Sequence, residues 1–311
     1  MTTLKSTYTI SKLSMGWGRN KSVFFIVLLF VGGCLLFVAN SYFNSISSSL
    51  RERITIGVYG EIPYVVSFDR KDSIATVVYF DSQKEVNMPG QYGWYKISSI
   101  NYLGAIEHKQ PQIIASMFEQ LVGVPVDIVM FPRTGKLLEP SEEKFYPYFM
   151  RTRMRQALLF DTYTSSARNI FDRYEMLQIL MTQNSQLLLI NGDKGQEIYE
   201  AEKLDTFLKG YFYQDILLAS HAKVILHVTA KQYKAATRFS RLLEGLGQKV
   251  HSIEVEEKDT SSCTLRYGAQ ERDVAKLLRV YMPRGCSLVE VEKKDIIIDM
   301  YFDDSFIGIY T

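Results

Sequence analysis

Three arginines at alternate positions form the densest cationic cluster after residue 52. These are Arg151, Arg153 and Arg155. Guanidinium groups bind phosphate and carboxylate oxygens in a bidentate manner, so this spacing is typical of a contact with a diphosphate or an anionic polymer. The alternative is a solvated basic face that pairs with the nearby Glu142 and Glu143. The sequence leaves both interpretations open.

The four histidines show no spacing that is typical of a metal site. They are His108, His221, His227 and His251, and none has a second histidine three or four positions away. We therefore interpret them as ordinary buried or surface residues, and we expect no metal and no cofactor. The chain also contains no Ser-His-Asp arrangement or phosphate loop, so no catalytic residue is assigned.

The chain has three cysteines, of which one lies in an apolar segment near the N-terminus. Cys34 is in that segment, whereas Cys263 and Cys286 lie in strand-like stretches far along the chain. Lone buried thiols are common in such stretches. Whether the latter two cysteines form a disulfide is left open.

A long segment without charged side chains separates Lys21 from Arg51. Its middle, Val23 to Ala39, is apolar throughout. A helix of this length, at about 1.5 Å per residue and extended by the uncharged residues that follow, just crosses a hydrocarbon core of roughly 30 Å. The sequence therefore predicts a transmembrane helix over residues 23–43.

The charges that flank this segment predict its orientation. Four cations precede it, and no acidic residue occurs before Glu52. Cytoplasmic flanks carry the excess of Lys and Arg, so we expect residues 1–22 to be a cytoplasmic head and the rest to lie outside the cell membrane. A cleaved signal peptide, a lipoprotein signal at Cys34 and a buried core helix are the alternatives.

Composition excludes some classes of function for the outer part of the chain. Of 36 Lys and Arg residues, four precede the apolar segment, which leaves 32 against 34 Asp and Glu. This part has no excess of positive charge, so we expect no nucleic-acid partner. A hydrophobic content of 47% predicts a packed core.

The outer part divides into a Ser-rich tether over residues 44–52 and two folded regions. In the first region, residues 53–219, the pattern predicts strands at 54–59, 64–68, 74–80 and 126–131. It predicts helices at 98–105, 110–121, 167–181 and 198–218. We expect a larger α/β domain with a central sheet.

The second region, residues 220–311, has the clearer pattern. Strands are predicted at 223–228, 249–255, 262–267, 288–291 and 296–301, and helices at 232–246 and 273–282. The order β-α-β-β-α-β-β predicts a small sandwich of one sheet covered by two helices. The fold class is therefore α+β, or mixed α/β.

This C-terminal pattern resembles the LytR C-terminal domain of cell-envelope proteins over about residues 221–305. The resemblance rests on the helix end Leu-Leu-Glu-Gly-Leu-Gly-Gln-Lys-Val at 242–250, on Asp259-Thr260 before a strand, and on a final strand opened by Asp295-Ile296. One turn departs from the pattern: the Asn-Gly-Thr turn of that domain is replaced by His227-Val228-Thr229.

The first region resembles a degenerate LytR-CpsA-Psr domain. The similar stretches are Val65–Asp69, Met88–Gly93 followed by Lys96-Ile97, and Leu121–Asp127. Members of that bacterial family transfer polyprenyl-pyrophosphate-linked glycopolymers to the cell wall. Such chemistry uses arginines to neutralise the diphosphate and carboxylates to hold a metal.

The family's charged residues are largely replaced in this chain. Asp81-Ser82-Gln83 stands where the family has Pro-Arg-Asp, and Tyr59-Gly60-Glu61 stands where it has Arg-x-Asp. The resemblance therefore implies a non-catalytic, membrane-anchored envelope protein that binds a wall polymer or an envelope partner. Its candidate contacts are Glu61, Arg151, Arg153 and Arg155. The alternative is an active phosphotransferase that attaches such glycopolymers to the wall, with Mg²⁺ as its cofactor.

Overall fold

The computed structural model describes most of the folded part of the chain. The described residues are 19–43, 51–71, 74–90, 92–132, 163–165, 171–174, 178, 186–192, 198–257, 262–282, 285–292 and 297–307. They fall into two compact units, Met1–Ser48 and Ser49–Thr311, which are considered separately.

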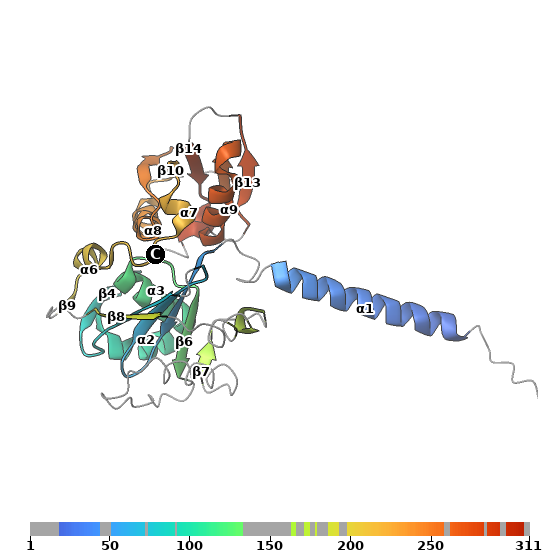
Figure 1. Ribbon diagram of the computed structural model, residues 1–311, viewed down its shortest axis with the longest axis horizontal. Helices are drawn as coiled ribbons and strands as arrows, with labels where there is room; N and C mark the ends of the chain where they lie inside the picture. The colour runs from blue at the N-terminus through green and yellow to red at the C-terminus, as the bar shows by residue number, and fades with distance from the viewer. Residues whose placement is uncertain are drawn as a thin grey trace, which may run out of the picture. The chain divides into compact units, whose positions relative to one another are not determined.

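The first unit contributes one helix, α1 (Arg19–Phe43), drawn in blue in Figure 1. Its large apolar side chains from Phe24 to Val38 are exposed, and Leu36 and Phe37 are each 74% exposed. Among the helices of the described residues, none combines the length and apolar character that crossing a bilayer demands. The transmembrane helix expected over residues 23–43 is therefore not confirmed.

In its described residues the second unit is mixed α/β, as expected, and contains three sheets. The largest has six strands, in the order β7 (Tyr163–Ser165), β6 (Ile128–Pro132), β1 (Arg53–Val58), β2 (Tyr64–Asp69), β3 (Ile74–Tyr79) and β8 (Gln186–Asn191). Strand β2 is antiparallel to both β1 and β3, because short turns join these three consecutive strands. These three strands are rich in Val, Ile and Phe and are almost wholly buried.

Helices α2 (Ile100–Ile106) and α3 (Gln110–Val122) follow the first strands. Met117, Phe118 and Leu121 of α3 are fully buried. A Cβ atom at Gly57 of β1 would lie 2.3 Å from the Phe118 ring, so only glycine allows this helix to approach the strand. Helix α3 ends at Gly123, which adopts the left-handed conformation with φ 69°.

A small three-stranded sheet lies beside α3 and was not predicted from the sequence. It consists of β5 (Gly93–Lys96), β4 (Glu85–Met88) and β9 (Ile198–Tyr199). The continuous helix expected over residues 198–218 is wrong. Residues 198–199 pair with β4, and the rest forms α6 (Ala201–Leu208) and α7 (Asp215–Leu218). The helix is broken between them, where Gly210 has φ 91°.

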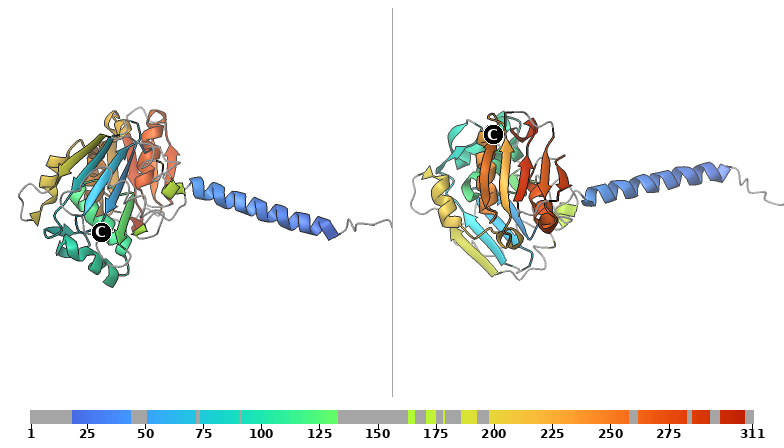
Figure 2. Two further views of the ribbon diagram at one scale, coloured as in Figure 1. Left: turned by 60° about the horizontal axis from the view of Figure 1, so that its bottom comes forward. Right: turned by 90° about the horizontal axis from the view of Figure 1, so that it is seen from above.

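The third sheet has five strands and belongs to the C-terminal part of the unit. Its order is β11 (Val250–Val255), β10 (Lys223–Val228), β14 (Ile297–Tyr301), β12 (Thr264–Tyr267) and β13 (Ser287–Glu290). Helices α8 (Tyr233–Gly245) and α9 (Arg272–Tyr281) complete it. Along the chain these elements occur in the expected order, and Figure 2 shows their strands in orange to red.

One face of this five-stranded sheet forms the core of the C-terminal part. Leu226 of β10, Met300 of β14 and Leu265 of β12 are fully buried on it. Phe239 of α8 contacts Phe302, which continues this face beyond β14. The opposite face carries His227, Asp299 and other polar side chains, because side chains alternate along a strand.

Cys263 and Cys286 form a disulfide, which settles the question that the sequence left open. The bond joins the residues that precede β12 and β13, two paired parallel strands. It therefore fastens one edge of the five-stranded sheet.

The two regions of Ser49–Thr311 share one hydrophobic core. Phe118 and Val124 from the first region and Leu243 from α8 belong to the same buried cluster. A Cβ atom at Gly245 would lie 2.0 Å from the carbonyl oxygen of Gly123, so the backbone of α8 touches the turn that ends α3.

Candidate functional site

Four strands of the six-stranded sheet end at the same edge. Strands β1 and β3 are both antiparallel to β2, β6 is parallel to β1, and β8 is parallel to β3. Their carboxyl ends therefore meet at one edge, which we call the strand-end edge. In open α/β sheets, ligands bind at such an edge.

Tyr59 forms the base of the first loop at the strand-end edge. Its hydroxyl lies 2.9 Å from the carbonyl oxygens of both Ile97 and Ser98 and accepts the N–H of Asn101 at 3.4 Å. Burial raises the pKa of the Tyr59 phenol. This side chain therefore stays neutral and joins the loop to the start of α2, which is a structural role.

The loop after β3 contains Asp81, Ser82 and Gln83. The backbone N–H of Asp81 donates to the hydroxyl of Tyr199 at 2.8 Å, and the Asp81 carboxylate accepts from the N–H of Gln83 at the same distance. The Lys84 ammonium lies 5.7 Å from the centre of the Tyr199 ring. Asp81 and Gln83 are exposed, and Ser82 is partly buried.

The described loops at the strand-end edge hold little positive charge. Among residues 59–63, 80–84 and 191–192, Lys84 is the one cation, and it accompanies the exposed carboxylates of Glu61 and Asp81. A diphosphate needs several cations or a metal for neutralisation. These loops alone are a poor diphosphate site.

Of the four contact residues expected from the sequence, the structure places one. Glu61 is exposed in the loop after β1, at the strand-end edge. Arg151, Arg153 and Arg155 lie outside the described residues, as does most of the helix expected over residues 167–181. Their proposed contacts remain predictions.

A groove of about 620 Å³ lies between the first region and helix α8. Met88 at the end of β4, together with Pro89 and Gly90 of the turn that follows, lines it beside residues of α3 and α6. Helix α8 contributes Tyr233, Lys234, Thr237, Arg238 and Arg241. The groove thus brings one of the family-like stretches, Met88–Gly93, next to the C-terminal part.

The arginines of the groove have carboxylate partners. Arg241 binds Asp205 through two hydrogen bonds of 2.6 and 2.7 Å and donates to the backbone oxygen of Gln120 at 2.8 Å. Arg238 lies 3.0 Å from Glu119. Burial raises the pKa of the Glu119 carboxyl, although the Arg238 guanidinium acts in the opposite direction. Both pairs fasten α8 to the first region.

Two further side chains of α8 face the groove and are exposed. Tyr233 is 49% exposed, and Lys234 is also exposed. Together with Pro89, they give the groove an aromatic surface, an apolar surface and a cation.

Sequence reasoning did not identify this groove. The signal was present in α8, where Lys234, Arg238 and Arg241 occur at intervals of four and three residues and therefore share one helix face. The other side of the groove could not be anticipated, because it depends on the unpredicted pairing of β4 with β5 and β9.

Comparison of the sequence with protein-family models and with curated proteins gives no match. Comparison of the structure with solved structures gives neighbours from the LytR-CpsA-Psr family. The Bacillus subtilis protein YwtF, also called TagT and solved with bound octaprenyl pyrophosphate lipid, is 13% identical with a TM-score of 0.34. The match covers 50% of this chain and 89% of that one.

Bacillus subtilis TagV is a second neighbour, 9% identical with a TM-score of 0.34, with 51% of this chain and 96% of TagV covered. A Listeria monocytogenes protein, described as the putative transcriptional factor Lmo1026, is 10% identical with a TM-score of 0.31. It is matched over 82% of its length and 45% of this chain. None of these values establishes the family of the whole chain.

Proposed function

We propose that this chain is a non-catalytic cell-envelope protein that binds an anionic wall glycopolymer in the groove between the β4–β5 turn and α8. The observation that carries the proposal is the groove itself, which combines Tyr233, Lys234 and Pro89 at its surface. The motif resemblance supplies the class of ligand.

The size and lining of the groove suit one or a few units of a polymer. Ligand pockets commonly measure about 300–1,000 Å³, and the groove lies within this range. The exposed ring of Tyr233 offers a flat apolar surface against which a sugar ring can pack. Lys234 offers a positive charge for an anionic group of the polymer.

The charges at the strand-end edge support the part of the proposal that concerns the absence of catalysis. Ser82 and Gln83 occupy the turn after β3, and neither side chain carries a formal charge. The described loops provide one lysine beside two exposed carboxylates, which would repel a diphosphate.

The proposed location is the outer face of the cell membrane. The exposed apolar side chains of α1 would associate with the bilayer, with residues 1–22 in the cytoplasm and the second unit outside. The Cys263–Cys286 disulfide supports an oxidising compartment, because disulfides are rare in the cytosol. A reporter fused after Thr311 that is active only in the cytoplasm would overturn this orientation.

The test is isothermal titration calorimetry, in which a purified anionic wall glycopolymer is added to the full chain in detergent. We expect Tyr233→Ala to weaken binding by about five- to ten-fold, because it removes one aromatic contact. Lys234→Ala should also weaken binding, and the loss should be larger at low salt than at high salt. Tyr102→Ala and Lys249→Ala are the matched controls, since both side chains are exposed and neither lines the groove.

Equal binding by all four variants would refute the groove as the binding site. The phosphotransferase alternative makes a different prediction, namely Mg²⁺-dependent release of phosphate from a polyprenyl diphosphate-linked oligosaccharide. We expect no turnover. Clear turnover that Glu61→Gln or Arg151→Ala abolishes would support the alternative.

A further inference from the structure

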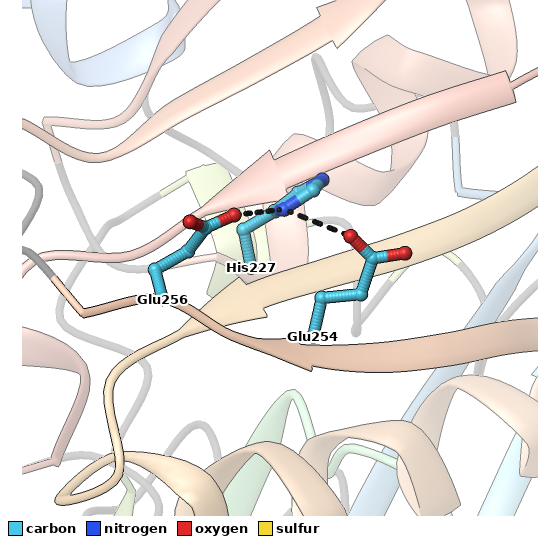
Figure 3. A group of neighbouring side chains, drawn as sticks. All are labelled: His227, Glu254 and Glu256. Carbon is cyan, nitrogen blue, oxygen red and sulfur yellow. Dashed lines mark hydrogen bonds and ion pairs between the residues drawn. The ribbon is translucent and has the colours of Figure 1, made fainter.

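One histidine of the C-terminal part is surrounded by carboxylates on the polar face of the five-stranded sheet. Figure 3 shows His227 of β10 with Glu254 and Glu256, which come from β11 and the residue just beyond it. The Nδ1 atom lies 3.0 Å from Glu256 and 3.7 Å from Glu254. The Nε2 atom lies 3.3 Å from Asp299 of β14.

The sheet register explains why these residues meet. Residue 227 is directly opposite Glu254 on the parallel strand β11, and Glu256 is two residues further along the same face. On the other side, His227 is opposite Tyr301 of β14, and Asp299 lies two residues before it. The Tyr301 ring stacks on the imidazole with centres 4.3 Å apart, which fixes the ring plane.

A neutral imidazole cannot satisfy this environment, because it carries one N–H. If Nε2 donates to Asp299, the lone pair of Nδ1 points toward Glu256 and Glu254, which carry lone pairs of their own. A cation shared by the three groups would satisfy this side of the ring. His227 is only 8% exposed, so its ring is largely shielded from bulk water, although the two glutamate side chains are about half exposed.

The arrangement has the features of a metal site with an oriented ligand. A metal-binding histidine commonly donates its other N–H to a carboxylate, which fixes its tautomer. Asp299, at 6% exposure, is placed to accept this hydrogen bond. This contact is independent of the two glutamates, which lie at the opposite ring nitrogen.

The ligand atoms are also suitably spaced. All three lie within 4.8 Å of one another. In a tetrahedral Zn²⁺ site with bonds of about 2.0–2.1 Å, two ligand atoms are about 3.3 Å apart. The distances of 3.0 and 3.7 Å from Nδ1 lie on either side of this value. The Glu254 and Glu256 side chains are about half exposed, so small rotations can close the site around an ion.

We propose that His227 Nδ1, Glu254 and Glu256 bind a divalent transition-metal cation, with Zn²⁺ preferred, and that Asp299 is a positioning residue that orients the imidazole. An imidazole nitrogen favours Zn²⁺ over Mg²⁺ or Ca²⁺, which prefer ligands that are all oxygen. With three protein ligands, the fourth position is open to water or to an anionic oxygen of a ligand. This proposal does not depend on the glycopolymer groove.

The sequence did not predict this site, and it predicted no metal. His227 and the two glutamates are 27 and 29 positions apart and come from different strands. The one local signal is the Glu-x-Glu spacing of Glu254 and Glu256, which places both carboxylates on the same face of a strand.

The test is isothermal titration of the full chain, in detergent, with ZnCl₂. All samples carry Cys34→Ser, because Cys34 is a free thiol and could bind zinc. We expect one Zn²⁺ per chain and no displacement by millimolar Mg²⁺. Glu254→Gln combined with Glu256→Gln should abolish binding, and Asp299→Asn should weaken it by about 10- to 100-fold.

Two matched controls are Glu257→Gln and His251→Gln, which change exposed neighbours outside the cluster and should leave binding unchanged. A second readout is ¹⁵N NMR of the histidine ring. Zinc should shift the Nδ1 resonance of His227 while Nε2 keeps its proton. The proposal is overturned if zinc binding survives the double glutamate change, or if Nδ1 of His227 stays protonated at saturating zinc. The latter result would show an imidazolium held by carboxylates.

Discussion

The arginines of the groove differ from surface cations in the contacts that they make. Arg241 donates from Nε and Nη2 to the two carboxylate oxygens of Asp205 and also reaches the backbone of Gln120, whereas Arg272 pairs with Glu290 in an exposed position. Such a bidentate, partly buried contact is worth more than an exposed ion pair. The Arg241–Asp205 pair thus has a structural role, whereas the Arg272–Glu290 pair has little effect on stability.

Arg241→Ala should therefore destabilise the second unit by about 1–3 kcal/mol, because it leaves Asp205 and the Gln120 carbonyl without their donor. The measurement is urea unfolding followed by circular dichroism. Arg272→Ala is the matched control and should leave the unfolding midpoint unchanged. If the two variants unfold at the same midpoint as the parent chain, Arg241 does not fasten α8.

Because of the buried phenol of Tyr281, we expect the stability of the fold to decrease at alkaline pH. Its hydroxyl accepts a hydrogen bond from the amide of Gln214 at 3.2 Å, and burial raises the pKa of its phenol. The unfolded pKa is about 10, so above this pH the unfolded chain loses a proton that the folded chain keeps. The contribution of Tyr281 to stability is full below about pH 10 and falls as the pH rises toward the folded pKa.

Tyr281→Phe should cost about 0.5–1.5 kcal/mol at pH 7, since it removes the hydrogen bond. Above pH 10 the difference between the two proteins should narrow, because phenylalanine does not ionise. Urea unfolding at a series of pH values measures this difference. Tyr102→Phe, at a position that is 73% exposed, should show no such trend. A difference that is constant from pH 7 to pH 11 would contradict the assignment.

At the scale of elements, the sequence predicted the parts whose periodicity is strong and local. Strands β1 to β3 and helices α3, α8 and α9 were anticipated within a few residues, because each has a continuous apolar face or run. Strands β4, β5 and β9 were missed. They have two to four residues each, too few to show a clear pattern, and β9 joins β4 from more than 100 residues further along the chain.

The candidate sites were less predictable than the elements for the same reason. The groove needs the β4–β5 turn beside α8, and the carboxylate cluster needs β10 between β11 and β14. Neither arrangement can be predicted from the spacing of residues along the sequence. The resemblance to the envelope family directed attention to Glu61, whereas the described structure gathers more polar contacts at the groove.

The contact between α3 and α8 gives a prediction for Gly245. At an exposed helical position, glycine to alanine stabilises by about 0.5–1 kcal/mol. At Gly245, the new Cβ atom would lie 2.0 Å from the Gly123 carbonyl oxygen and 2.8 Å from a methyl group of Val124. Gly245→Ala should therefore destabilise by about 1–3 kcal/mol, through forced separation of the helix from the turn.

Thermal unfolding of Gly245→Ala measures this effect. Glu244→Ala, which changes the exposed neighbour on the same helix, is the control and should have a small effect. A raised melting temperature for Gly245→Ala would show that the helix and the turn are not in close contact.

At the scale of the whole molecule, the structure separates two places where a polymer could be held. The strand-end edge is where the family resemblance locates its chemistry, and its described loops carry one lysine beside Glu61 and Asp81. The groove joins the two regions of the second unit, which also share a core. Polymer binding in the groove would therefore stabilise the contact between these regions.

Hydrogen–deuterium exchange of the full chain, with and without the anionic glycopolymer, tests this account most directly. We predict slower exchange in the β4–β5 turn, residues 88–93, and along residues 233–241 of α8, with no change in the loops at 59–63 and 80–84. Protection confined to the strand-end loops, or no protection anywhere at saturating polymer, would contradict the account.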